Sequence, residues 1–276
     1  MSTFTRATTC NGYADLCSRS YGNTTFFGSH DSYAVDTDPL DLSRDQEVDI
    51  TTQLDLGVRL LQAEAHLWED ELYFCHTIDY LTTVLSWLDD NTEEVLTLLF
   101  TNPDSVALDI WSAAFEDAGI VDLLYVPSTV PVLRADWPTL GELIDDGTRV
   151  VMFMDYGADT SEVDYILPEF EMIWETPYDV TDASFPCSVN RIDTDYSTVE
   201  EHMYMINHFL DVDILGILIP DYDAASTTNS ETSIVANANG CVPYSGVDSW
   251  PSFVLMDWVD IGDGQEAVDY LNGISS

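Results

Sequence analysis

The stretch Val95–Gly119, VLTLLFTNPDSVALDIWSAAFEDAG, indicates the fold class of this chain. Its first seven residues are almost all apolar, which is typical of a strand that is buried on both faces. The segment 105–118 then has the apolar spacing of a helix, and Gly119 is a residue that commonly ends one. A buried strand followed directly by a helix is the repeating unit of α/β proteins, so we expect parallel strands joined by helices.

The same alternation recurs along the chain. Strands are expected at 24–28, 58–65, 71–76, 95–101, 149–154, 170–174, 214–219 and 253–259. Helices are expected at 45–56, 81–88, 105–118, 140–144, 199–210 and 265–271. Eight strand candidates in 276 residues, with no break in composition, favour a single (β/α)8-type TIM barrel over an open doubly wound sheet. We therefore expect one barrel domain over residues 1–276, of which 1–23 form an N-terminal loop segment.

The charge of the chain excludes several functions. There are 51 acidic residues against seven arginines and no lysine, which gives a formal net charge of −44. Such a surface repels phosphate backbones and disfavours anionic membranes, so we expect no nucleic-acid partner. Hydrophobic residues make up 46% of the chain, which is enough for a large core and argues against disorder. Self-repulsion predicts an acidic or salty working environment, or bound cations.

The five cysteines allow two interpretations. Cys10 and Cys17 bracket a short loop that can close as a disulfide, Cys187 and Cys241 can form a second pair, and Cys75 is left over. The alternative is a cytosolic protein with five buried thiols. No spacing typical of a zinc site occurs.

The rest of the sequence favours a secreted protein. The triplet Asn23-Thr24-Thr25 is a glycosylation sequon, and the first residues lack the apolar core of a signal peptide. We therefore expect a secreted protein whose leader has been removed. No stretch approaches the ~20 apolar residues of a membrane-spanning helix.

Ionisable residues gather at the ends of the expected strands, where α/β barrels carry their active sites. These residues are His30, Asp31, Glu64, His66, His76, Asn102, Asp104, Asp155 and Asp257. Two imidazoles, one neutral and one protonated, can take a proton from a nucleophile and give one to a leaving group. His202 and His208 lie six apart on an expected helix, so we interpret them as surface or packing residues. Cys75 adjoins His76, but neighbours on a strand point to opposite faces, which argues against a thiol nucleophile.

Several motifs resemble those of fungal secreted phospholipase-C-like phosphodiesterases. The first of them are Cys10-Asn-Gly-Tyr-Ala-Asp-Leu-Cys17, Gly28-Ser-His-Asp-Ser32, Gly57-Val-Arg-Leu-Leu-Gln62 and Cys75-His-Thr77. The later ones are Ala224-Ala-Ser-Thr-Thr-Asn229, Ala236-Asn-Ala-Asn-Gly-Cys241 and Phe253-Val-Leu-Met-Asp257. Each is weak alone, but together and in this order they identify the chain as similar to that family from about residue 10 to 271.

The resemblance implies a fold and a set of roles. The family is related to phosphatidylinositol-specific phospholipase C, an α/β barrel with a PI-PLC X domain. By motif, His30 would be the general base and His76 the general acid. Asp257 would pair with His30, and Asp31 would orient His76. His66 matches no catalytic position, so we interpret it as structural.

The chain also departs from its relatives. Bacterial members place an arginine at the position of Glu64, whereas metal-dependent members place carboxylates at Gln62 and Glu64 and an amide at Asp31. A phosphodiester facing Glu64 without a cation would be repelled by roughly 1–4 kcal/mol. We therefore hypothesise a Ca²⁺ or Mg²⁺ ion held by Glu64 and Asp31, with Asn102 or Asp104 as a further ligand. The alternative is that Glu64 pairs with Arg59 or a histidine.

The phosphate-binding basic residues of bacterial relatives find no match, since Met154 and Asp155 stand in that region. Arg59, Asn102 and Asp155 remain as candidates for substrate binding. The first hypothesis is a phosphoric diester hydrolase or lyase, acting on a phospholipid-like or glycerophosphodiester substrate. The others are a catalytically inactive barrel that serves as a secreted binding protein, and a sphingomyelinase-D-like lyase. We expect a monomer that makes at most peripheral membrane contact.

Overall fold

The computed structural model describes residues 6–38, 40–68, 71–73, 77–195 and 197–274. The chain packs as two compact units. The first consists of Met1–Thr24 and Ala63–Glu169, and the second of Thr25–Gln62 and Phe170–Ser276. The chain passes from the second to the first inside strand β2 (Leu60–Glu64).

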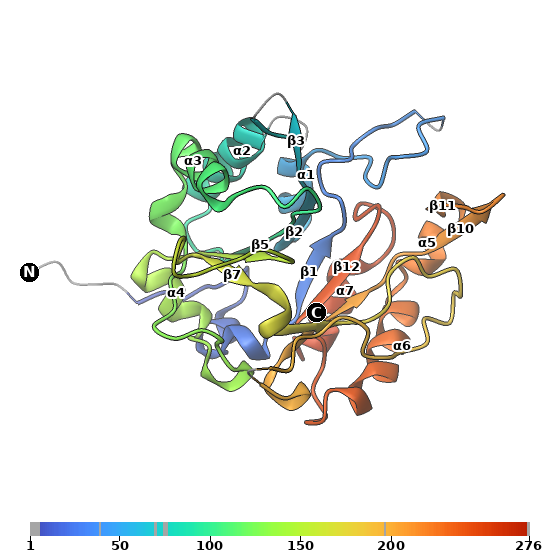
Figure 1. The fold of residues 1–276 in the computed structure, drawn as a ribbon. Coiled ribbons are helices and arrows are strands. Elements are labelled where there is room, and N and C mark those ends of the chain that lie inside the picture. The colour runs from blue at the N-terminus through green and yellow to red at the C-terminus, as the bar shows by residue number, and fades with distance from the viewer. Residues whose placement is uncertain (1–5, 39, 69–70, 74–76, 196, 275–276) are drawn as a thin grey trace, which may run out of the picture. The chain divides into compact units, whose positions relative to one another are not determined.

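The first unit contains three parallel strands in the order β5–β6–β7, which are Leu96–Thr101, Val150–Met154 and Ile166–Pro168. Its helices are α2 (Thr77–Asp90), α3 (Leu108–Ala118) and α4 (Leu140–Asp146), and Figure 1 shows α2 and α3 side by side. A separate hairpin pairs β3 (His66–Trp68) with β4 (Glu71–Tyr73). The run expected to be a buried strand is β5, and Gly119 ends α3 with a φ of 75° that suits glycine.

The N-terminal segment is held against β5. The side-chain amide of Asn11 donates to the carbonyl of Val95 at 3.1 Å, and its oxygen accepts from the Val95 N–H at 2.7 Å. The buried Tyr21 hydroxyl lies 2.6 Å from the Thr97 hydroxyl. The expected disulfide Cys10–Cys17 closes the loop that contains Asn11. Hydrogen bonds thus hold the segment against β5, and the disulfide constrains the conformation of the segment itself.

The second unit contains five parallel strands in the order β2–β1–β12–β9–β8. Their bounds beyond β2 are Phe26–Ser29 for β1, Phe253–Met256 for β12, Met203–Asn207 for β9 and Ile173–Glu175 for β8. Its helices are α1 (Ile50–Asp55), α5 (Ala225–Thr228), α6 (Glu231–Cys241) and α7 (Gly264–Leu271). A separate antiparallel hairpin joins β10 (Asp211–Ile214) to β11 (Ile217–Pro220).

The prediction of a helix at 199–210 is wrong, because this region contains β9. All five residues of β9 are buried, so the run is apolar on both faces and its periodicity does not distinguish strand from helix. His202 and His208 therefore flank a strand and are both buried packing residues.

Two of the eight expected strands, 71–76 and 214–219, belong to hairpins instead of the parallel ladders. The parallel ladders contain β7 and β9 in their place, neither of which the sequence analysis assigned as a strand. Parallel pairing is confirmed throughout both ladders. The closure of the predicted barrel is not observed, because within the described residues neither the ladder of the first unit nor that of the second closes on itself.

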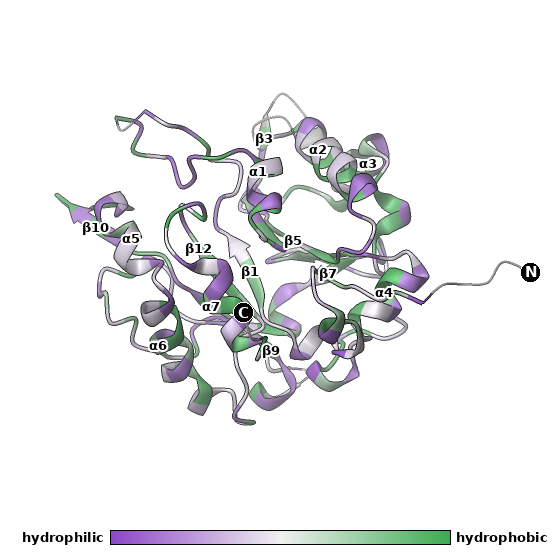
Figure 2. Ribbon diagram, turned by 180° about the vertical axis from the view of Figure 1, so that it is seen from behind, coloured by the Kyte–Doolittle hydropathy of each residue, from purple (hydrophilic) through white to green (hydrophobic). Residues whose placement is uncertain are grey.

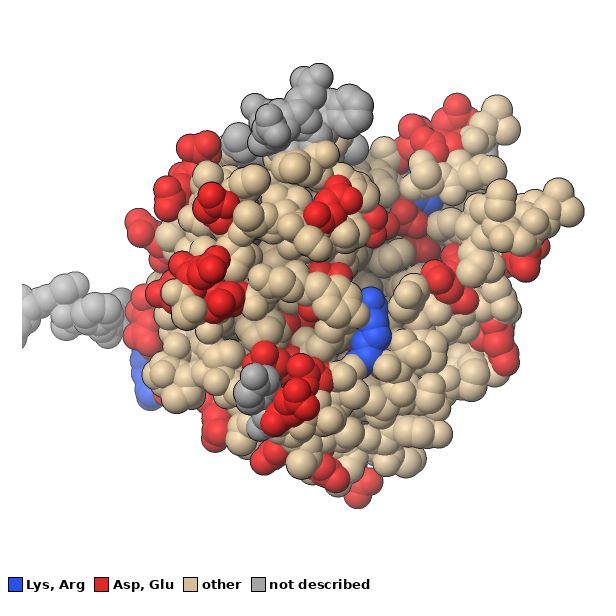
Figure 3. All heavy atoms as spheres, in the orientation of Figure 1, with Lys and Arg blue, Asp and Glu red and all other residues tan. Residues whose placement is uncertain are grey.

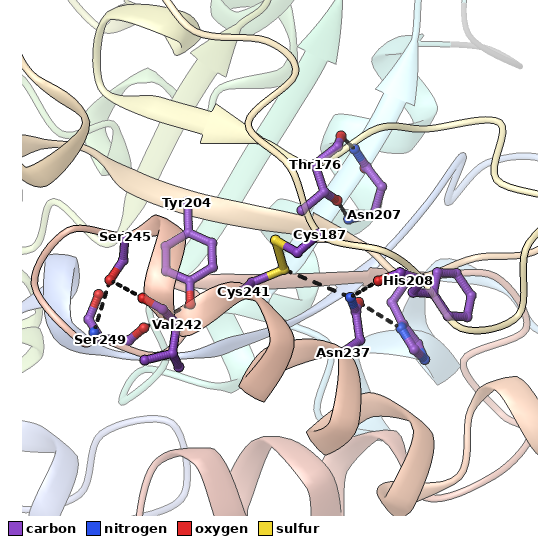
Figure 4. Close-up of a disulfide and its surroundings, with 11 residues drawn as sticks. Thr176, Cys187, Tyr204, Asn207, His208, Asn237, Cys241, Val242, Ser245 and Ser249 are labelled. Atoms are coloured by element: carbon purple, nitrogen blue, oxygen red, sulfur yellow. Dashed lines mark hydrogen bonds between the residues drawn. A yellow bond between two sulfur atoms is a disulfide. The ribbon is translucent and has the colours of Figure 1, made fainter.

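The second expected disulfide, Cys187–Cys241, lies in the second unit (Figure 4). The Asn237 side chain fills the space between this bond and His208. Its amide nitrogen lies 3.8 Å from Cys241 Sγ and donates to the Phe185 carbonyl, and its oxygen lies 3.0 Å from His208 Nδ1. Cys75 lies outside the described residues.

Acidic side chains are scattered over the face drawn in Figure 3 among other residues, whereas basic side chains occur there only at isolated places. The hydropathy colouring of Figure 2 shows that the helices of each unit alternate between polar and apolar residues, as expected where one face covers a sheet. None of the described helices is long and apolar enough to cross a membrane.

Candidate active site

A histidine–carboxylate pair forms where β1 and β12 end. The two strands are parallel neighbours with Ser29 opposite Met256, so the next residue of each chain segment emerges at the same edge. His30 Nδ1 lies 2.8 Å from Asp257 Oδ1. The Asp257 side chain is buried, whereas 22% of the His30 side chain is exposed. The carboxylate therefore orients an imidazole that keeps access to solvent.

A further carboxyl group, Asp45, lies beside this pair. Within the part of the chain that the structure describes, His30, Asp45 and Asp257 are the one group whose ligand atoms all lie within 4.8 Å of one another. The second oxygen of Asp257, Oδ2, is buried and has no hydrogen-bond partner among the described residues. The pair thus sits in an acidic and partly unsatisfied environment.

The protonation states follow from this crowding. Burial disfavours the charged imidazole, but the charges of Asp31, Asp257 and Asp45 outweigh it and raise the pKa of His30 to about 10. Burial and the neighbouring Asp257 raise the pKa of Asp45 to about 9, and the pKa of Asp257 is raised mainly by burial. Asp211 has a pKa raised to about 6 for the same reasons. At neutral pH the site holds an imidazolium and at least one protonated carboxyl.

Buried amides fasten the loops that carry the pair. The Gln46 amide nitrogen donates to the carbonyls of His30 and Met256, and its oxygen accepts from the Val259 N–H. The Asn229 amide donates to the carbonyls of Asp257 and Trp258. Each amide thus connects its own segment by hydrogen bonds to a segment that is distant in the sequence. These contacts fix the backbone on both sides of the His30–Asp257 bond.

Asp31 is placed by the neighbouring strand. Its N–H donates to the Gln62 side-chain oxygen at 2.7 Å, while the Gln62 carbonyl accepts from the Ser32 N–H and hydroxyl. Asp31 has a φ of 35°, in the left-handed region that aspartate tolerates better than most residues. Gln62 therefore shapes the turn after β1. His76, which Asp31 is expected to orient, lies outside the described residues.

An aromatic ring covers the imidazole. Phe209, two residues after β9, stacks on His30 with ring centroids 3.9 Å apart and planes inclined by 6°. Sequence reasoning missed this residue because it treated 199–210 as a helix. It also missed Asp45, Gln46 and Asp211, which lie in polar stretches without a distinguishing motif.

The expected ligands Glu64 and Asp104 hold a histidine in the first unit. His66 Nε2 lies 3.0 Å from Glu64 Oε1, and His66 Nδ1 lies 3.1 Å from Asp104 Oδ2, which also accepts from the Leu67 N–H. This is the alternative in which Glu64 pairs with a histidine. A hard cation held by Glu64 and Asp104 would take the place of the imidazole at both carboxylates.

The three candidates for substrate binding make structural contacts. Asn102 is buried, and its side chain bonds to the backbone of Val106 in both directions. Asp155 Oδ1 accepts from the N–H groups of Asn102 and Tyr156.

The Arg59 guanidinium donates to the carbonyls of Leu54 and Val58. Arg59 directly precedes β2, and its backbone N–H donates to the Phe27 carbonyl in β1. Its guanidinium and its backbone thus both contact backbone carbonyls of the same unit.

The profile of the PI-PLC X 1 family matches residues 16–272. The chain belongs to this family. Two curated relatives come from the fungus Arthroderma benhamiae. One, named an uncharacterized secreted protein, is 38% identical over 92% of this chain and 61% of its own length. The other, named PI-PLC X domain-containing protein 1, is 37% identical over 96% of this chain and 90% of its own length. The chain thus spans less than two thirds of the first of these relatives.

Among solved structures, the phosphatidylinositol-specific phospholipase C from Listeria monocytogenes matches this PI-PLC X chain with a TM-score of 0.52. The match covers 94% of this chain and 96% of the bacterial one at 11% sequence identity. The likeness shows that the fold is of the phospholipase-C type, in agreement with the family resemblance found in the motifs.

Proposed function

We propose that this PI-PLC X protein is a phosphoric diester hydrolase or lyase that acts on a phospholipid-like or glycerophosphodiester substrate. The observation that carries the proposal is the 2.8 Å contact between His30 Nδ1 and Asp257 Oδ1 at the carboxyl ends of β1 and β12. A buried carboxylate that orients a solvent-accessible imidazole is suited to proton transfer. The family and the phospholipase-C fold support the same class of reaction.

The proposed chemistry moves two protons. The Nε2 atom of His30 takes the proton of the attacking hydroxyl, whose oxygen forms the new bond to phosphorus. The bond to the leaving alcohol breaks, and that oxygen receives a proton from His76. A substrate hydroxyl as nucleophile gives a cyclic phosphodiester, whereas water gives direct hydrolysis. Asp257 stabilises the imidazolium that forms on His30, and Asp31 is proposed to orient His76.

The charge state of His30 adds a condition to this mechanism. Because its pKa is raised to about 10, His30 is an imidazolium in the free protein at neutral pH. That positive charge can attract the substrate phosphate in a chain that has no lysine and no arginine at position 64. To act as the base, however, His30 must first lose its proton.

The pH–rate profile of kcat/KM therefore tests the role of His30. If His30 is the base, activity rises with pH up to its pKa. If activity falls through that pKa, His30 donates the proton and the two histidine roles are exchanged. His30→Ala should abolish turnover of a glycerophosphodiester. Full activity of His30→Ala contradicts the mechanism, and His66→Ala serves as the matched histidine control.

No step is assigned to a divalent cation, because His66 occupies the carboxylates of Glu64 and Asp104. Turnover measured with Ca²⁺, with Mg²⁺ and with EDTA tests this. Cation-dependent activity would contradict a mechanism without a cation.

The product distinguishes the remaining alternatives. Release of free choline from a choline phospholipid indicates the sphingomyelinase-D-like reaction, and no turnover under any condition indicates a binding protein.

We further propose that the protein is secreted. Two disulfides, Cys10–Cys17 and Cys187–Cys241, support this, since they persist in oxidising compartments. The relative named a secreted protein points the same way. Mass measurement of the protein from culture medium, with and without reductant, tests the compartment and the two bonds together.

A further inference from the structure

The sequon Asn23-Thr24-Thr25 takes no part in the proposed chemistry. It is the only such triplet in the chain, because none of the other nine asparagines is followed two positions later by serine or threonine. A sequon by itself does not show that a sugar is attached. The fold decides whether the asparagine can carry a glycan and whether the hydroxyl of the third residue is accessible when the sugar is transferred.

A short 3-10 turn, Tyr21–Asn23, places the acceptor asparagine at the surface of the first unit. The Asn23 N–H donates to the Ser20 carbonyl at 2.9 Å and so closes the turn. Tyr21 and Gly22 are buried, whereas Asn23 is exposed. The turn therefore packs its first two residues into the protein and leaves the third one accessible to a bulky, hydrophilic group.

The hydrogen bond of the Asn23 side chain is compatible with a glycan. The Arg134 guanidinium donates to Asn23 Oδ1 at 2.7 Å. An N-linked glycan is attached through the other atom, Nδ2, and the linked amide keeps its carbonyl oxygen as an acceptor. A glycan on Asn23 can therefore be carried without breaking the contact with Arg134.

The hydroxyl of the third sequon residue is buried in the second unit. Thr25 is 5% exposed, and its Oγ1 donates to the Pro251 carbonyl at 2.7 Å. The Asn272 side chain accepts from the Thr25 N–H and donates to the Thr25 carbonyl. The sequon requires this hydroxyl, because only serine or threonine serves at the third position. The glycan must therefore be added before the second unit has folded.

The order of synthesis provides time for that step. Pro251 and Asn272 follow Thr25 by 226 and 247 residues. Strand β1, which begins at Phe26, pairs with β12 from Phe253 onwards, so this ladder also waits for the last part of the chain. At ~5–20 residues per second, roughly 10–50 s pass before these partners are made. Throughout that time the Thr25 hydroxyl remains accessible on the growing chain.

We propose that Asn23 carries an N-linked glycan that is added to the nascent chain during secretion. The donor is an oligosaccharide linked through a diphosphate to a membrane lipid. Asn23 Nδ2 forms a bond to C1 of the first sugar and gives up a proton, the bond from C1 to the phosphate oxygen breaks, and the lipid diphosphate leaves. The inference rests on the proposed secretion and is independent of the phosphodiesterase chemistry.

The test is the mass of the full chain secreted by a fungal host, measured before and after treatment with an amidase that removes N-linked glycans. We expect the wild type to lose the mass of a glycan, and peptide mapping to find an aspartate at position 23 afterwards. Asn23→Gln should lose no mass on this treatment. The matched control is Asn190→Gln, at an exposed asparagine outside any sequon, and it should lose the same mass as the wild type.

Wild-type protein in the medium with unmodified Asn23 overturns the proposal and leaves secretion standing. Wild-type protein retained inside the cells with unmodified Asn23 contradicts the proposed secretion as well. Peptide mapping of the wild type decides the matter even if Asn23→Gln is not secreted. The timing is tested on unglycosylated protein from bacteria, supplied with the transferase and the lipid-linked donor. Modification of the reduced, unfolded chain but not of the folded protein supports the proposed order, and modification of both to the same extent contradicts it.

Discussion

The substitution Asp45→Asn should remove a defined part of the pH dependence of stability. Asp45 is buried beside His30 and Asp257, and burial together with the charge of Asp257 raises its pKa to about 9. In the unfolded chain an aspartate has a pKa of about 3.9. Between pH 5 and pH 8 the folded protein therefore holds one proton on Asp45 that the unfolded chain has lost.

The sign and size follow from proton linkage. Because the folded state binds the extra proton, the free energy of unfolding falls as pH rises, by about 1.4 kcal/mol per pH unit for one proton. Over the three units this amounts to about 4 kcal/mol. Asparagine mimics the protonated carboxyl and does not titrate. The stability advantage of Asp45→Asn over the wild type should therefore grow by about 4 kcal/mol between pH 5 and pH 8.

Urea unfolding at several pH values, in low-salt buffer with EDTA, measures this difference. Urea is preferred because guanidinium chloride would screen the charges. Asp263→Asn is the control, since it removes the same formal charge from an exposed position at the start of α7. Its stability should follow the wild-type curve in parallel. Parallel curves for Asp45→Asn and the wild type would refute the reasoning, because they would mean that Asp45 is ionised in the folded state.

Three further predictions concern the disulfides, a buried amide and the candidate site. Removing Cys187–Cys241, which spans 54 residues, should lower the free energy of unfolding by about 4 kcal/mol, against about 2.5 kcal/mol for Cys10–Cys17, which spans 7; equal losses in urea unfolding would contradict this. Asn237→Ala should cost about 2 kcal/mol, since it removes the partner of His208 Nδ1 and of the Phe185 carbonyl, and an unchanged urea midpoint would refute it. Asp257→Asn should lower kcat/KM by about 10²–10⁴-fold and lower the pKa of His30 in an NMR titration; unchanged kinetics would contradict the proposed pairing.

Predictions from local patterns succeeded where one periodicity dominated. The run 95–101 is strand β5, and Gly119 ends α3 where its conformational freedom predicts. The spacing of Cys10 and Cys17 allowed a short disulfide that the structure contains. Prediction from local patterns failed at β9, because its residues are buried on both faces and its hydrophobic pattern has no alternation that identifies a strand.

The candidate site was only partly visible in the sequence. His30 was found because it follows an expected strand, Asp257 was found because it lies in the last expected strand, and the family resemblance implied that the two pair. The Glu64 carboxylate was assigned to a cation, and its contact with His66 was one of the alternatives. No sequence pattern marked Asp45 or Phe209 as part of the site. Both reach the imidazole from loops whose paths depend on the packing of the whole unit.

The sequence by itself determined the α/β class, the family and the strongly negative charge, and it allowed the two disulfide pairs that the structure contains. These depend on residue type, spacing and order, which are local or additive properties. Only the tertiary structure decided which acidic residues surround His30, which imidazole Glu64 binds and which residues of the sequon are buried. Burial and proximity set those outcomes, because the pKa of a side chain depends on its neighbours in space and not on its neighbours in the chain.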